Sequence, residues 1–252
     1  MDLQPTSRAL RLLTAAVLSA TLFALFPFAT SALKNGTGLP NEISLIVSNV
    51  WSLCTLADYI TGMSLVLPYL VCLGPTPWTG TLWCILELLL GTPVLLIRGI
   101  ARLALHSTVA EAIVPFAAGT ATSPNRPGTV LLRWSAGLLA VVFTGVCSYA
   151  LATESISVGW GFIRTHPSSL LLFALQLSGV LFTAMYIWIR ERNNLWMAIP
   201  TLILLVFLGN VVTAVYVLLA SIGATSVQDA LLVRRSVLGR SRRFYYEQLD
   251  EE

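Results

Sequence analysis

The sequence predicts an all-α fold, a polytopic bundle of helices in a membrane. Hydrophobic residues make up 56% of the 252 residues and charged residues 11%, with a mean hydropathy of +0.79. A soluble domain carries about 25% charged residues. Each of six apolar runs is long enough to cross a hydrocarbon core about 30 Å thick, which takes about 20 helical residues. The runs are residues 10–28, 45–73, 79–96, 130–152, 170–189 and 195–222.

Arg8 and Arg11 precede the uninterrupted part of the first apolar run, residues 12–28, and small residues follow at positions 29–32. A signal peptide has the same order of features, but its apolar core is only about 7–15 residues long. We therefore expect a retained first span, with a cleaved signal peptide as the alternative.

A tryptophan and a glycine each recur at the same spacing in the sequence, which predicts two related three-helix units. Trp78 and Trp196 lie 118 residues apart, and so do Gly91 and Gly209. In each half the tryptophan stands at the start of the third apolar run and the glycine interrupts that run. Ordinary interfacial tryptophans are the alternative explanation of the first pair.

The expected domains are a first unit at residues 1–104, a linker at 105–129, a second unit at 130–233 and a flexible tail at 234–252. Three spans in each unit would reverse the second unit relative to the first, which predicts inverted repeats. The proline- and glycine-containing linker is expected to be a loop with a short interfacial or re-entrant helix near residues 109–118. The alternative for this linker is a seventh span.

The basic residues do not agree on one orientation of the chain across the membrane. Arginines begin the tail at 234–252, so the positive-inside rule places the tail in the cytoplasm, or in the stroma of a plastid. With six spans, Arg11 lies on that side as well. Arg98, Arg102 and Arg133 then fall on the opposite side, against the rule.

Polar residues inside the spans are the best candidates for a functional site, because ionisable groups at membrane depth are costly. Asp58 and Glu87 lie about 21 Å and 14 Å from the turn that joins their spans, at 1.5 Å per helical residue. Neighbouring carboxylates favour sharing a proton, so the pair is a candidate proton or cation relay. The alternative is structural, with Arg98 paired to Asp58 or with hydroxyls bonded to the carboxylates. At the offset of 118 residues, Asp58 aligns with Gln176 and Thr92 with Asn210. The candidate polar centre consists of Asp58, Glu87, Arg98, Gln176 and Asn210.

The sequence shows no sign of a cofactor or a catalytic residue. The four cysteines form no C-x-x-C motif or cluster with histidine, so no metal is expected and they are interpreted as small apolar residues. There is no H-E-x-x-H, G-x-S-x-G or glycine-rich phosphate motif. No basic patch with interleaved aromatic residues indicates nucleic acid as a partner. The cysteines are Cys54, Cys72, Cys84 and Cys147.

The second half combines Trp188, the charged turn at residues 190–192, Trp196 and then the Gly-Asn pair at 209–210. Together with the segment at 56–59, Leu-Ala-Asp-Tyr, this combination resembles a small family of plant and algal multi-pass membrane proteins. The resemblance covers a quarter to a half of the chain and implies a membrane fold. It implies no mechanism, because that family has no established activity.

We therefore expect an integral membrane protein whose partners are the lipid bilayer and, in one alternative, other membrane proteins. The favoured function is that of a transporter or channel for a small solute or ion. A non-catalytic subunit, scaffold or assembly factor is the alternative, and a lipid-modifying enzyme is the third reading.

Overall fold

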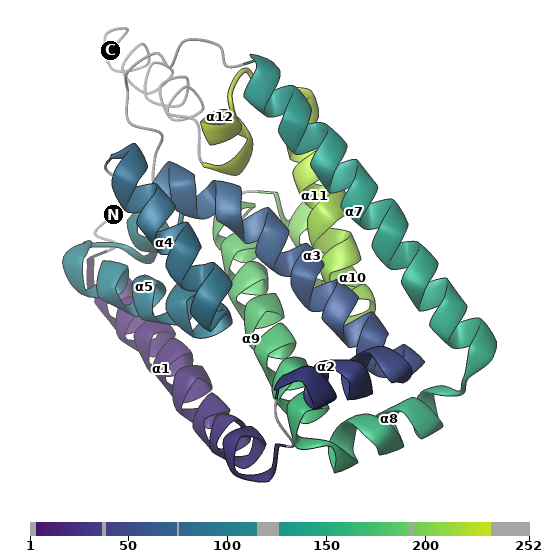
Figure 1. Cartoon of the computed structure of the whole chain (residues 1–252). Coiled ribbons are helices and arrows are strands. Elements are labelled where there is room, and N and C mark those ends of the chain that lie inside the picture. Colours follow the sequence, from purple (N-terminus) through teal and green to yellow (C-terminus); the bar gives the residue numbers. More distant parts are fainter. Residues whose placement is uncertain (1–3, 37–38, 75, 115–125, 192–193, 233–252) are drawn as a thin grey trace, which may run out of the picture.

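The structure is a bundle of helices, shown in Figure 1 as a computed structural model. It describes residues 4–36, 39–74, 76–114, 126–191 and 194–232, and no strand occurs among them. The tail at 234–252 and much of the predicted linker at 105–129 lie outside the described residues. The all-α membrane fold is supported, because four helices are long and apolar enough to span a bilayer.

These four helices are α1, α3, α7 and α9, so the six or seven spans predicted from the sequence are not confirmed. The bounds are Gln4–Asn35 for α1, Val50–Leu73 for α3, Arg126–Thr153 for α7 and Pro167–Arg190 for α9. At 24 residues, α3 and α9 are each about 36 Å long. Short helices precede them, α2 (Leu39–Ser48) before α3 and α8 (Ile156–Thr165) before α9.

The third predicted span of each half is broken into two shorter helices. Gly91 separates α4 (Pro77–Leu90) from α5 (Thr92–Leu105), and Gly209 separates α10 (Leu195–Leu208) from α11 (Asn210–Ile222). The sequence predicted both interruptions. Each short helix has 13 or 14 residues, about 20 Å, which is less than a hydrocarbon core requires.

Each broken pair folds back to the end of the bundle where it began. The Tyr69 hydroxyl, near the end of α3, donates to the carbonyl of Ile113 in α6 (Val109–Ile113), just after α5. The Tyr186 hydroxyl, near the end of α9, donates likewise to the carbonyl of Leu231 in α12 (Val227–Leu231). We call α4–α5 and α10–α11 the two hairpins, and the end where they open the hairpin end. The helices α2 and α8 lie at the opposite end, which is lowest in Figure 1.

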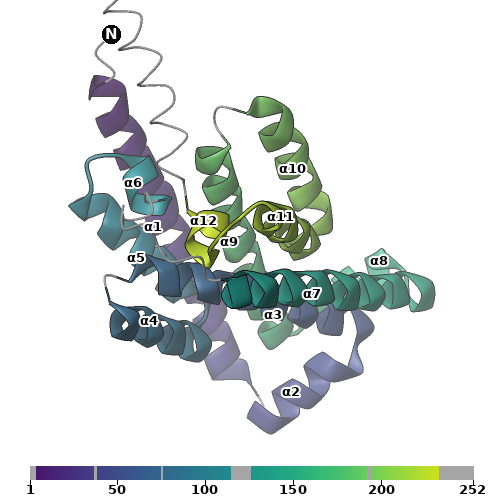
Figure 2. The same ribbon diagram turned by 90° about the horizontal axis from the view of Figure 1, so that it is seen from above.

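The helix order of residues 4–113 recurs in residues 126–231, with matching lengths after the first helix. The two halves are not inverted, because α3 and α9 run in the same direction. Ser52 bonds Ser169 near the start of both helices, and Tyr69 meets Tyr186 near their ends, with ring centroids 5.5 Å apart. The inverted arrangement expected from three spans per unit is therefore wrong. Seen from above, the hairpins flank the α3–α9 pair (Figure 2).

Arginine side chains gather at the hairpin end, where they bind helix ends. Arg11 donates to the carbonyl of His106, which follows α5, at 2.7 Å. Arg133 donates to the carbonyl of Ser221 in α11 at 2.9 Å. Cations near the C-terminal end of a helix are stabilised by its dipole and by its free carbonyl groups. These bonds connect the first helix of each half to the hairpin of the same half.

Candidate functional site: an intramembrane polar centre

Asp58, in the first half of α3, is bound by the second hairpin and by α9. Its side chain is 6% exposed. One carboxylate oxygen accepts the backbone N–H of Asn210 at 2.8 Å, and the other accepts the side-chain amide of Gln176. The Asn210 amide donates in turn to the Asp58 carbonyl at 3.1 Å. Asp58 therefore caps the N-terminal end of α11, where an anion is stabilised by the helix dipole.

Gly209 makes this cap possible. Its φ of +59° lies in the left-handed region that favours glycine. A Cβ added at this position would lie 2.6 Å from a carboxylate oxygen of Asp58. A larger residue would therefore strain the backbone and push the carboxylate away from Asn210.

The first hairpin meets α9 by a corresponding contact. The Thr92 hydroxyl at the start of α5 donates to the carbonyl of Leu175 at 3.1 Å, as the Asn210 amide does to the carbonyl of Asp58. Gly91 has a φ of +71°, and a Cβ there would lie 2.1 Å from the Tyr59 hydroxyl. The tips of both hairpins therefore pack closely against the paired long helices.

Glu87 reaches the same region from α4. Its side chain is 1% exposed, and its Oε2 has no hydrogen-bond partner. It lines a cavity of about 20 Å³, shared with Tyr59, Thr92, Gln176 and other residues of the two tips. A space of this size holds one water molecule. We call Asp58, Glu87, Gln176 and Asn210 the polar centre.

Arg98, the fifth residue predicted for the site, lies apart from these four. Its guanidinium stacks over the ring of Trp83, 4.9 Å from the centroid, and its side chain is 5% exposed. Among the described residues no ion pair joins it to Asp58 or to Glu87. The structural Asp58–Arg98 pair considered from the sequence is therefore not formed, and amide groups satisfy Asp58 instead.

A crevice of about 650 Å³ leads to Asp58 from the end of the bundle that carries α8. Asp58 and Gln176 are among its lining residues, with Trp160 of α8 and Phe143 of α7. Most of the lining is apolar. Gln176 also borders the small cavity beside Glu87, so it separates the crevice from that cavity.

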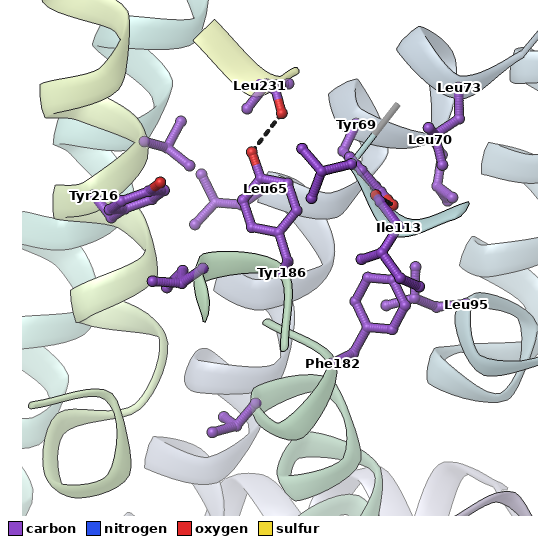
Figure 3. Close-up of a cluster of buried hydrophobic side chains, with 14 of the residues drawn as sticks. Leu65, Tyr69, Leu70, Leu73, Leu95, Ile113, Phe182, Tyr186, Tyr216 and Leu231 are labelled. Atoms are coloured by element: carbon purple, nitrogen blue, oxygen red, sulfur yellow. Dashed lines mark hydrogen bonds between the residues drawn. The ribbon is translucent and has the colours of Figure 1, made fainter. Parts of the chain in front are cut away.

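Buried aromatic residues fill the bundle between the polar centre and the hairpin end (Figure 3). Tyr69 packs edge-on against Phe182 and Tyr186, with ring centroids 6.1 Å and 5.5 Å apart. All three side chains are buried. We call these three residues the aromatic seal. The crevice therefore approaches the polar centre from the end that carries α8, whereas packed side chains lie between the centre and the hairpin end.

The sequence reasoning missed Tyr59 and two glycines that face the hairpin tips. A Cβ at Gly62 of α3 would lie 2.6 Å from the Asn210 amide, whereas a Cβ at Gly179 of α9 would be in ordinary contact with Thr92, at 3.7 Å. These glycines are 117 residues apart, one fewer than the offset of the hairpin glycines. An alignment of α3 with α9 at that spacing would have found them.

Comparisons with known proteins add no family. No protein-family model matches the chain, and no curated protein or solved structure is significantly similar to it. The resemblance to plant and algal membrane proteins therefore stays a prediction. Among the described residues, no group of three or more histidine, cysteine or acidic side chains is placed to hold a metal ion.

Proposed function

We propose that this protein is a transporter or channel that moves a small cation, protons included, through the polar centre. The observation that carries the proposal is the meeting of two half-helix tips and two buried carboxylates against paired spans. Broken helices whose ends meet inside a membrane form ion and substrate sites in secondary transporters. Intramembrane carboxylates are costly, which favours a functional role for them.

Charge favours a cation over an anion. Each half-helix N-terminus is equivalent to about +0.5 of an elementary charge. At each tip the C-terminus of α4 or α10 meets this N-terminus and offsets it with about −0.5 of a charge. Two ionised carboxylates therefore leave a net charge of about −2, which cations or protons neutralise. Among the described residues no arginine forms an ion pair with either carboxylate, because Arg98 stacks over Trp83 instead.

One-sided access supports transport over a purely structural role. The crevice reaches Asp58 from the end that carries α8, and the aromatic seal fills the opposite side. A transporter requires that the site open to one side at a time. In this reading the crevice admits the cation, and a shift of a hairpin tip opens the second side.

We also propose that the two halves arose by duplication and that the hairpin end faces the cytoplasm, or the stroma. Two full spans per half keep both halves in one orientation, as in parallel repeats. Arg11, Arg133 and Arg190 then lie on one side with the end of α12. This orientation satisfies the positive-inside rule, which the six-span arrangement violated.

The test is cation flux into liposomes that contain the purified protein, measured with a pH-sensitive dye and with Na⁺ or K⁺ gradients. Asp58→Asn is the informative variant, because asparagine also caps helices and accepts the Asn210 N–H. We expect it to lower flux at least tenfold while the protein stays folded. Glu154→Gln removes a carboxylate at the end of α7 and is the matched control with normal flux.

A charge exchange sharpens the test. Asp58→Asn combined with Gln176→Glu moves the carboxylate from α3 to α9 and keeps the hydrogen-bonded pair. Partial recovery of flux is expected, since the charge of the centre is restored. The proposal fails if the wild type moves none of these cations, or if Asp58→Asn transports normally. Stable co-purification of other membrane proteins, with full tolerance of Asp58→Asn, would favour a scaffold.

A further inference from the structure

Two cysteines from opposite halves of the chain meet between α3 and α7. The Sγ atoms of Cys54 and Cys147 are 2.9 Å apart, although the residues are 93 positions apart in sequence. A disulfide has an S–S distance of about 2.05 Å. A closing movement of about 0.9 Å would therefore bring the two sulfurs to bonding distance.

The surroundings hold the pair in place and leave it open to a reagent. Cys54 is 7% exposed and packs with Phe143 and Ala150, and Cys147 packs against the same cluster. Both cysteines also line the 650 Å³ crevice, so a small oxidant has access to them. The other two thiols, Cys72 and Cys84, lack a cysteine neighbour of this kind, and Cys84 donates to the Leu67 carbonyl.

The depth of the pair fits an oxidising side of the membrane. Cys54 is the fifth residue of α3, about 6 Å from the helix start. Cys147 is about 9 Å from the end of α7. Both therefore lie near the end that carries α2 and α8, opposite the arginines that bind the hairpins. The positive-inside rule places that end away from the cytoplasm, on the side where disulfides persist.

We propose that Cys54 and Cys147 form a disulfide bond that joins the two halves of the protein. Each thiol gives up its proton, and the pair transfers two electrons to a second disulfide of the oxidising compartment, such as oxidised glutathione. That disulfide is reduced to two thiols as the Cys54–Cys147 bond forms. The bond ties α7, one wall of the crevice, to α3, which carries Asp58. The inference rests on the proposed orientation of the hairpin end and does not depend on the transport proposal.

Thiol counting on the full-length protein tests this directly. Membranes are dissolved under denaturing conditions and labelled at lysis with a maleimide-linked polymer, either directly or after reduction and removal of the reductant. The wild type should show two free thiols before reduction and four after it. Cys54→Ser and Cys147→Ser should each show three free thiols in both states. The matched control Cys72→Ser should show one before reduction and three after it.

Peptide mass spectrometry under non-reducing conditions supplies the second readout. The expected product is one linked peptide pair that contains Cys54 and Cys147 and lacks two hydrogen atoms relative to the reduced peptides. Four free thiols in the unreduced wild type would overturn the proposal. A disulfide that joins two copies of the chain, seen as a dimer on a non-reducing gel, would also overturn it.

Discussion

Replacing Gly209 by alanine tests whether the second hairpin tip depends on its contact with Asp58. The new Cβ would lie 2.6 Å from one carboxylate oxygen and 3.0 Å from the other, and the backbone φ of +59° is strained for alanine. Backbone strain of this kind costs about 1–3 kcal/mol. Losing the charge-assisted bond to the Asn210 N–H costs about 1.5–3 kcal/mol more. We therefore expect Gly209→Ala to lower the free energy of unfolding by about 3–5 kcal/mol.

The assay is reversible unfolding of the purified protein by a denaturing detergent added to a mild one. Gly145→Ala in α7 is the matched control, because nothing lies within 4 Å of its added Cβ. It should be neutral or stabilising by about 0.5–1 kcal/mol, as expected inside a helix. In an Asp58→Ala background the clash disappears, so Gly209→Ala should then cost only the backbone strain. A Gly209→Ala variant within 0.5 kcal/mol of wild type, or one whose cost is unchanged in that background, would refute the reasoning.

Three further predictions follow from the same contacts. Asp58→Ala leaves two buried N–H donors unpaired, so it should lower the free energy of unfolding by about 2 kcal/mol more than Asp58→Asn does. The same detergent titration measures both variants, and equal losses would contradict the capping role of Asp58. Phe182→Ala empties part of the aromatic seal and should cost about 3–5 kcal/mol and raise proton leak into liposomes, whereas unchanged leak would argue against a seal. The Cys54–Cys147 bond would close a loop between residues 93 positions apart, so its reduction should lower the free energy of unfolding by about 4–5 kcal/mol. The Cys54→Ser variant should show no such change when a reductant is added.

Composition and apolar runs were enough to predict the helical membrane fold. The tryptophan and glycine spacing predicted the two breaks, because a glycine in an apolar helix marks a place where the backbone departs from helical geometry. The predicted number of spans, six or seven, is not confirmed, and the reason is physical. Residues 79–96 and 195–222 are apolar enough to cross a bilayer, and hydropathy does not distinguish a crossing helix from two half-helices that turn back.

The candidate centre was predicted in part. Asp58, Gln176 and Asn210 lie together in the structure. The sequence predicted this grouping because the spacing of the two glycines aligned the correct segments of the two halves. The Asp58–Arg98 pair was wrong because it assumed that the third span continued straight past Gly91, whereas the break folds α5 back against α4, where Arg98 stacks over Trp83. The crevice and the contact between Cys54 and Cys147 depend on how α7 packs against α3. This packing could not be predicted, because nothing in the local sequence of either helix indicates which distant helix it contacts.

The re-entrant hairpins are the central claim, and labelling of single cysteines in sealed vesicles tests them most directly. Trp78 and Ser107 stand at the two ends of the first hairpin, and Ser157 marks α8 at the opposite end of the bundle. In a background without native cysteines, Trp78→Cys and Ser107→Cys should react with an impermeant maleimide from one side, and Ser157→Cys from the other. Labelling of Ser107→Cys from the side of Ser157→Cys would mean that α4 and α5 cross the membrane, and would contradict this account.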